Sequence, residues 1–181
     1  MILLYRVFSY LIYPFLVIVV YCRKKINKEH SHRYKEKIFV SHFNIKKRRQ
    51  DVKLIWFHAA SIGESLSVLP ILRKLNSDKS IVQIVLTTGT VTSANILQDK
   101  LSKKIIHQYI PFDIPSYINK FLNHWNPSQA VFLESEIWPN FLTELNKRNI
   151  CSLIVNGRMT IKSFKRWSIL SGSSKKIFSN F

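Results

Sequence analysis

Short apolar runs alternate with amphipathic stretches from residue 53 onward, and this alternation constrains the fold more than any other feature. The apolar runs have the length of strands and are residues 53–58, 81–87, 104–110, 129–133 and 151–155. The stretches between them have helical spacing and are residues 64–75, 91–101, 115–125 and 138–147. Strands that alternate with helices of about 10–15 residues are typical of βαβ units. The runs are largely apolar rather than alternating, which is expected of strands covered on both faces. The sequence therefore predicts an α/β fold built on a parallel sheet.

Polar or small residues follow each apolar run. These clusters are residues 58–64, 87–92, 111–113, 134–140 and 156–158. Because the carboxyl ends of parallel strands share one edge of a sheet, the clusters are expected to converge there, where α/β proteins bind ligands. Three of the seven acids between residues 54 and 144 lie in them, namely Glu64, Glu134 and Glu136.

The three glutamates allow proton-transfer chemistry. A carboxylate at this edge can accept a proton from a hydroxyl nucleophile, and two neighbouring carboxylates can divide roles because repulsion separates their pKa values. Each also has a structural interpretation. Glu64 could have the purely structural role of complementing the positive end of a helix dipole. Glu134 or Glu136 could cap the helix that begins near Pro139.

Two further clusters are candidates for binding. The threonines around Thr88 offer hydroxyls and backbone N–H groups that suit a phosphate or a sugar hydroxyl, or they simply cap a helix. Arg158 could pair with a carboxylate or phosphate through its guanidinium, or be an ordinary surface arginine. No Walker lysine and no Gly-x-Gly-x-x-Gly motif supports a nucleotide phosphate loop, and the His and Cys residues show no metal-ligand spacing.

Residues 2–22 form an apolar segment that contains Arg6 and Pro14. Its length approaches the roughly 20 residues that cross a bilayer, and three basic residues, 23–25, follow it. The positive-inside rule then places the remainder in the cytoplasm. A spanning anchor, an interfacial segment and a buried core helix all remain open.

Positive charge is concentrated on both sides of a neutral body. The net charge is +18, of which residues 23–53 carry +9 and residues 145–181 carry +8. Such blocks indicate an anionic partner, either phospholipid headgroups or nucleic acid. The adjacent apolar segment favours anionic membrane lipid and disfavours nucleic acid. We therefore divide the chain into a membrane anchor (1–22), a basic juxtamembrane segment (23–52) and an α/β domain (53–181).

Four motifs together resemble the 3-deoxy-D-manno-octulosonic acid (Kdo) transferases. They are residues 60–64 (ASIGE), 111–115 (PFDIP), 134–140 (ESEIWPN) and 156–159 (NGRM), of which the Glu-x-Glu-x-Trp-Pro-Asn string is the most specific. The resemblance runs through nearly the whole chain. Gly157 and Thr160 depart from it, since the family usually has Ala and Ser there.

The resemblance implies the N-terminal, Rossmann-like half of a GT-B inverting glycosyltransferase. Such an enzyme transfers Kdo from CMP-Kdo to a lipid A precursor at the cytoplasmic face of the inner membrane, without a cofactor or metal. It implies that Glu64 is the general base and that Glu134 assists at the transition state. We further expect substrate contacts from Ser61, Gly63, Thr88, Glu136, Asn140 and Arg158.

Length is the largest departure, because family members are roughly twice as long. The C-terminal donor-binding half is therefore expected to be absent from this chain, together with the CMP-Kdo site. Two hypotheses follow: an acceptor-binding half that works with a separate donor-binding chain, or a non-catalytic membrane-bound remnant that at most binds anionic glycolipid.

Overall fold

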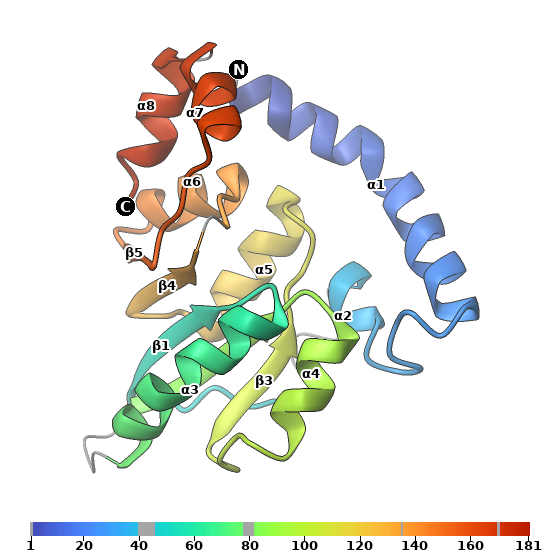
Figure 1. The fold of residues 1–181 in the computed structure, drawn as a ribbon, viewed down its shortest axis with the longest axis vertical. Coiled ribbons are helices and arrows are strands. Elements are labelled where there is room, and N and C mark those ends of the chain that lie inside the picture. Colours follow the sequence, from blue (N-terminus) through green and yellow to red (C-terminus); the bar gives the residue numbers. More distant parts are fainter. Residues whose placement is uncertain (1, 40–45, 78–81, 135, 170) are drawn as a thin grey trace.

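The computed structural model describes residues 2–181, except for residues 40–45, 78–81, 135 and 170 (Figure 1). The described residues form a five-stranded sheet in the order β3-β2-β1-β4-β5, and every neighbouring pair is parallel. The strands are β1 (Lys53–His58), β2 (Val82–Thr88), β3 (Ile105–Tyr109), β4 (Gln129–Leu133) and β5 (Cys151–Val155). This arrangement confirms the predicted α/β fold, with three strands at the predicted bounds.

A helix follows each of the first four strands. These helices are α3 (Ile62–Ser77), α4 (Val91–Gln98), α5 (Pro115–Trp125) and α6 (Pro139–Lys147). α4 ends three residues earlier than predicted, because the chain turns at Asp99 with Lys100 and Leu101 both bonded to the Leu97 carbonyl. The alternation of strand and helix is the physical origin of the parallel sheet, since each helix returns the chain to the same edge.

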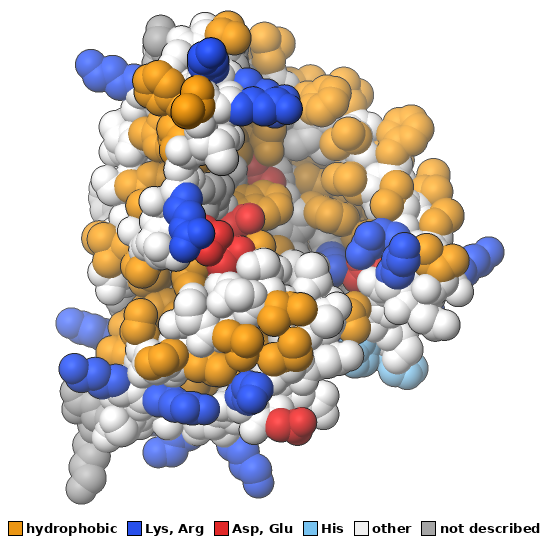
Figure 2. All heavy atoms as spheres, viewed as in Figure 1, with side chains coloured by type: hydrophobic (Ala, Val, Ile, Leu, Met, Phe, Trp, Pro, Cys, Tyr) orange, Lys and Arg blue, Asp and Glu red, His pale blue; other side chains and the backbone are white. Residues whose placement is uncertain are grey.

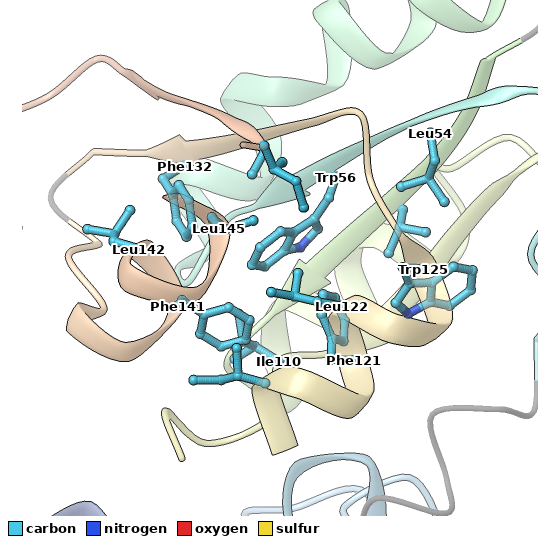
Figure 3. Close-up of a cluster of buried hydrophobic side chains, with 14 of the residues drawn as sticks. Leu54, Trp56, Ile110, Phe121, Leu122, Trp125, Phe132, Phe141, Leu142 and Leu145 are labelled. Atoms are coloured by element: carbon cyan, nitrogen blue, oxygen red, sulfur yellow. The ribbon is translucent and has the colours of Figure 1, made fainter. Parts of the chain in front are cut away.

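The helices cover the sheet from both sides. α3 and α4 contribute Val68, Leu72 and Leu97 to one buried cluster, while α5 and α6 contribute to a second, more aromatic cluster. Trp56 lies at the centre of the second cluster, with ring centroids 4.9 Å from Phe121 and 5.1 Å from Phe141 (Figure 3). Such ring pairs each add about 0.5–1.5 kcal/mol beyond the burial of apolar area.

Two C-terminal helices were not predicted, namely α7 (Ile161–Ile169) and α8 (Ser171–Phe178). α8 returns toward α6, and its Ile177 joins the aromatic cluster. The last residue, Phe181, places its ring 6.0 Å from that of Phe132. The C-terminal residues therefore complete the core on the α5/α6 side.

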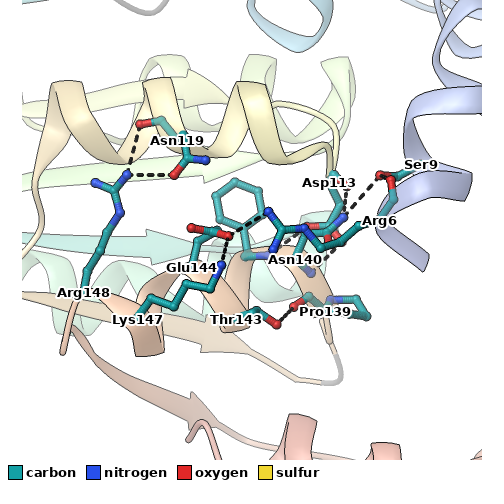
Figure 4. Close-up of polar contacts among 11 residues, drawn as sticks. Arg6, Ser9, Asp113, Asn119, Pro139, Asn140, Thr143, Glu144, Lys147 and Arg148 are labelled. Carbon is teal, nitrogen blue, oxygen red and sulfur yellow. Dashed lines mark hydrogen bonds and ion pairs between the residues drawn. The ribbon is translucent and has the colours of Figure 1, made fainter. Parts of the chain in front are cut away.

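The apolar N-terminal segment is a single helix, α1 (Ile2–Lys25), that lies along the carboxyl edge of the sheet (Figure 1). Four polar side chains fasten it to the body, and Figure 4 shows two of them, Arg6 and Ser9. The Tyr5 hydroxyl donates to Asp113 at 2.9 Å, and Arg6 pairs with Glu144 at 3.2 Å. Ser9 accepts from the Asn140 amide at 3.4 Å, and Tyr13 donates to the carbonyl of Ile38 at 2.8 Å. Each of these contacts lies on one face of the helix.

The opposite face of α1 is apolar and exposed. Its exposed side chains include Leu3, Leu4, Val7, Phe8, Leu11, Phe15 and Ile18. Figure 2 shows this helix as a band of hydrophobic side chains above a hollow in the body. The helix is long and apolar enough to cross a membrane by length and composition.

Much of the basic segment 23–52 folds into the body. Arg23 and Lys37 both pair with the buried carboxylate of Glu29, at 2.8 and 2.5 Å. Lys46 donates to the carbonyl of His107, and Arg48 donates to the carbonyl of Trp125. α2 (Lys35–Ile38) lies within this segment and buries Ile38 against α1. Part of the positive charge is therefore used internally rather than facing a partner.

Candidate active site

The strand order reverses between β1 and β4, and this switch point positions the candidate site. β2 and β3 extend the sheet on one side of β1, whereas β4 and β5 extend it on the other. The connections that leave β1 and β4 therefore diverge to opposite faces and open a crevice at their carboxyl ends. Ligands of open α/β sheets bind at such crevices.

A cavity of about 250 Å³ lies at this edge, between the sheet and α1. Four of the five predicted clusters reach it, through Ala60 after β1, Gly89 after β2, Phe112 after β3 and Trp138 after β4. Leu16, Val19, Val20 and Arg23 of α1 form the opposite wall. The predicted convergence is thus present, with α1 as an additional wall that the strand pattern did not indicate. The fifth cluster, residues 156–158, does not line this cavity.

Gly89 brings two of these loops close together. A β-carbon on Gly89 would lie 3.6 Å from the carbonyl oxygen of Ala60, and the Gly89 carbonyl accepts from the Lys37 ammonium at 2.9 Å. Burial lowers the pKa of Lys37, although the neighbouring Glu29 favours its charged form. The Lys37–Glu29 pair thereby fixes α2 against the loop after β2.

His58 and Glu136 meet across the switch point. His58 ends β1 and is 1% exposed, and its Nε2 lies 3.7 Å from Oε2 of Glu136. Trp138 donates its indole N–H to the same carboxylate oxygen at 2.9 Å. The imidazole of His58 holds the pKa of Glu136 below its ordinary value, partial burial opposes this, and the Trp138 hydrogen bond adds to the lowering.

Glu64 occupies the first turn of α3 and forms a capping arrangement with Ser61. The Glu64 N–H donates to the Ser61 hydroxyl at 3.3 Å, and the Glu64 Oε2 accepts the Ala60 N–H at 2.8 Å. This is close to the Ser-x-x-Glu capping box, in which the glutamate reaches back to the start of the helix. The carboxylate is 5% exposed and adjoins Ala60, a wall residue of the cavity. The capping interpretation of Glu64 therefore has direct geometric support, and one carboxylate oxygen, Oε1, has no hydrogen bond within the described part of the chain.

Glu134 adopts a left-handed backbone conformation, with φ of 56°. Its N–H still donates to the carbonyl of Val155 at 2.9 Å, so it extends the β4–β5 ladder by one bond before the chain turns away. A non-glycine residue in this region costs on the order of 1 kcal/mol or more, and such residues cluster at functional sites. The side chain is partly exposed at the edge. Residue 135 lies outside the described residues.

The other predicted contact residues are placed in different ways. Thr88 is fully buried, and its hydroxyl lies 2.9 Å from Nε2 of His107 rather than lining the cavity. Asn140 is 1% exposed and fastens α6 to Asp113 and to Ser9 of α1. Gly63 lies in the first turn of α3, where a β-carbon would meet only the Ser61 hydroxyl, at 4.0 Å. Arg158 is exposed beyond β5. Their roles in substrate binding stay predictions.

Two chemically important residues carried no role in the sequence-based prediction. His58 is a polar residue at the end of an otherwise apolar run, which is a signal that sequence reasoning could have used. Asp113 accepts the N–H groups of Asn140 and Phe141 at the start of α6, as well as the Tyr5 hydroxyl. Burial raises the pKa of Asp113 to about 6, against the lowering effect of these hydrogen bonds. Within the described residues there is no group of three or more His, Cys, Asp or Glu that could hold a metal ion.

A second cavity of about 370 Å³ adjoins the first. It lies between α1 and the edge and shares Leu16, Phe112 and Trp138 with the first cavity. Its other walls include Phe8 and Ile12 of α1 and Ile114. The two cavities thus adjoin beneath the exposed helix, and the first, although mainly apolar, is also lined by Arg23, Lys37 and His58.

The fold and this edge define an α/β protein with a ligand crevice at its topological switch point. The chain matches the family described as 3-Deoxy-D-manno-octulosonic-acid transferase (kdotransferase) over residues 32–181. It therefore belongs to the Kdo transferase family.

Named relatives occur in bacteria and in a plant. A 3-deoxy-D-manno-octulosonic acid transferase of Rickettsia bellii is 39% identical over 180 residues, which cover 98% of this chain and 41% of the relative. A probable mitochondrial 3-deoxy-D-manno-octulosonic acid transferase of Arabidopsis thaliana is 36% identical over 165 residues, which cover 91% of this chain and 36% of the relative. A 3-deoxy-D-manno-octulosonic acid transferase of Haemophilus influenzae is 32% identical over 125 residues, covering 69% and 29%. The chain thus spans about two fifths or less of these relatives.

Proposed function

We propose that this chain is the acceptor-binding part of a Kdo transferase of lipopolysaccharide biosynthesis, which transfers Kdo from CMP-Kdo to a lipid A precursor. The observation that carries this proposal is the pair of adjoining cavities beneath α1. The second cavity, which is almost wholly apolar, suits acyl chains, and the first, where Arg23, Lys37 and His58 join the apolar lining, suits the sugar headgroup. Family membership supports the same reaction class.

The proposed mechanism gives Glu64 the role of general base. The carboxylate takes the proton of the acceptor hydroxyl, the hydroxyl oxygen attacks the anomeric carbon of Kdo, and CMP leaves with the electrons of the broken bond. A single displacement of this kind inverts the anomeric configuration. The support is that Glu64 is held rigidly beside the cavity wall with Oε1 still available, because positioning precedes proton transfer. We assign Glu134 a supporting role at the transition state, on the basis of its strained position at the edge.

We propose that the chain works at the cytoplasmic face of the inner membrane, with α1 lying in the interface. The apolar face of α1 would enter the lipid, while Tyr5, Arg6, Ser9 and Tyr13 keep the helix on the body. A helix that crossed the bilayer could not keep these four contacts. Anionic lipid is a proposed partner for the basic residues that remain on the surface.

The test uses membranes that contain this chain, CMP-Kdo and a lipid A precursor, with the donor-binding half of a family member supplied as a second chain. We expect transfer that falls at least a hundredfold in Glu64→Gln, whereas Asp99→Asn, an exposed acid after α4, retains it. Full transfer by Glu64→Gln would overturn the role of Glu64. Glycolipid binding without transfer in every combination would favour the non-catalytic alternative.

A further inference from the structure

The orientation of the His58 ring is fixed by its inner nitrogen. Nδ1 lies 3.2 Å from the carbonyl oxygen of Thr87 and 3.0 Å from the Thr87 hydroxyl. That hydroxyl already donates to the carbonyl of Phe57 and accepts the indole N–H of Trp56. Because a carbonyl oxygen can only accept, Nδ1 must carry a proton.

The outer nitrogen of His58 has no hydrogen-bond partner among the described residues. Nε2 is buried and faces Oε2 of Glu136 at 3.7 Å, which is longer than a hydrogen bond. A buried polar atom without a partner destabilises the fold, because its lost hydration is not replaced. Without a proton on Nε2, the ring would point a lone pair at the Glu136 carboxylate, so an additional group between them is favourable.

One hydroxyl oxygen can reach both Nε2 of His58 and Oε2 of Glu136. An oxygen about 2.8 Å from each atom can lie beside a separation of this size. It would accept the Nε2 proton and donate its own to Glu136, which satisfies all three groups. His58 and Trp138 both line the first cavity, and Trp138 holds Glu136 in place beside them.

We infer that His58 and Glu136 form a subsite for a sugar hydroxyl of the acceptor headgroup. This inference rests on the proposed function, since it assigns the contacts of that acceptor beside Glu64. The ligand class is a pyranose with a free hydroxyl, and no bond is made or broken at this subsite.

Binding to detergent-solubilised full chain tests the subsite without requiring transfer. The probes are a phosphorylated, tetra-acylated glucosamine disaccharide and an anionic phospholipid with four acyl chains. We expect His58→Gln and Glu136→Gln each to weaken binding of the disaccharide about tenfold while leaving phospholipid binding unchanged, because one hydrogen bond to a charged group is lost. His32→Gln, at an exposed histidine of the basic segment, should bind both probes like the parent chain.

A second measurement does not depend on the variants folding. The imidazole ¹³C and ¹⁵N signals of His58 in the parent chain should move when the disaccharide is added and stay in place with the phospholipid. Unmoved His58 signals during disaccharide binding, or equal affinities for the parent chain and both variants, would overturn the subsite and leave the proposed function standing. If the parent chain binds the disaccharide no tighter than the phospholipid, the proposed acceptor fails and the subsite fails with it.

Discussion

His107 should make this fold acid-sensitive. It lies in β3, and its Nδ1 is 3.0 Å from the guanidinium of Arg33, which can only donate. Nδ1 must therefore accept, and Nε2 carries the proton that it donates to Thr88 at 2.9 Å. Protonation of Nδ1 would point a second N–H at the guanidinium of Arg33, so that two donors would face each other. Burial, followed by the charges of Arg33 and Lys46, lowers the pKa of His107 to about 3.

The magnitude follows from linkage between protonation and folding. The unfolded chain binds the proton near pH 6.5, whereas the folded chain resists it down to about pH 3. The unfolded state therefore binds more protons between these values, so the stability due to His107 is complete above pH 6.5 and is lost as the pH falls. Between pH 7 and pH 5 the loss is about 2 kcal/mol, and over the whole window it is about 5 kcal/mol.

Urea unfolding of the parent chain and of His107→Gln, followed by circular dichroism in detergent at pH 7 and pH 5, measures this term. Gln keeps an acceptor and a donor but does not titrate. We expect the parent chain to lose about 2 kcal/mol more than the variant between the two pH values. Asp113 titrates in the opposite sense, because a raised carboxyl pKa favours the folded state as the pH falls from about 6, but it is common to both chains and cancels. Parallel loss of stability in the two chains would refute the reasoning.

Three further predictions concern single contacts. Lys37→Met should cost about 3 kcal/mol in urea unfolding, because it leaves the buried Glu29 with Arg23 alone, whereas Lys28→Met at an exposed site should change little. Gly157→Ala should stabilise the folded chain by about 0.4–1 kcal/mol and so raise the melting temperature slightly, since its β-carbon would make ordinary contacts of 3.6–3.7 Å with Ile154. A lower melting temperature would contradict this. Trp138→Phe should raise the pKa of Glu136 in a ¹³C carboxyl titration, because the indole N–H that favours the carboxylate is removed.

The sheet could be predicted from the sequence because its signals are local. β1, β4 and β5 lie at the predicted bounds, since each is a short apolar run closed by a polar cluster. The convergence of the loops followed from the parallel topology alone. The sequence could not predict which side chains face the cavity, because the direction of a side chain depends on its neighbours in the folded chain. Thr88 turns inward to His107, a residue 19 positions away, whereas Gly89 after it reaches the cavity.

The capping role of Glu64 and the helices after residue 160 show two other limits. Ser61 and Glu64 carry the Ser-x-x-Glu spacing of a capping box, so the local contact was present in the sequence, yet the same spacing is compatible with catalysis. α7 and α8 lack a strand between them and break the alternation on which the prediction was built. Their place depends on Ile177 reaching the aromatic core, a contact that no local pattern specifies.

α1 shows most clearly why composition and position must be read together. By length and hydropathy this helix could cross a membrane, and Arg6 would then be an unfavourable charge within the span. In the folded chain Arg6 instead pairs with Glu144, whose carboxylate also accepts from Lys147. Tyr5, Arg6, Ser9 and Tyr13 recur at spacings that place them on one face of a helix, which is the pattern of a helix lying on a protein surface. A spanning helix would leave Arg6 in hydrocarbon and Asp113 without its Tyr5 donor. The polar face therefore argues that this helix lies on the body beside the candidate site rather than extending away from it as a separate span.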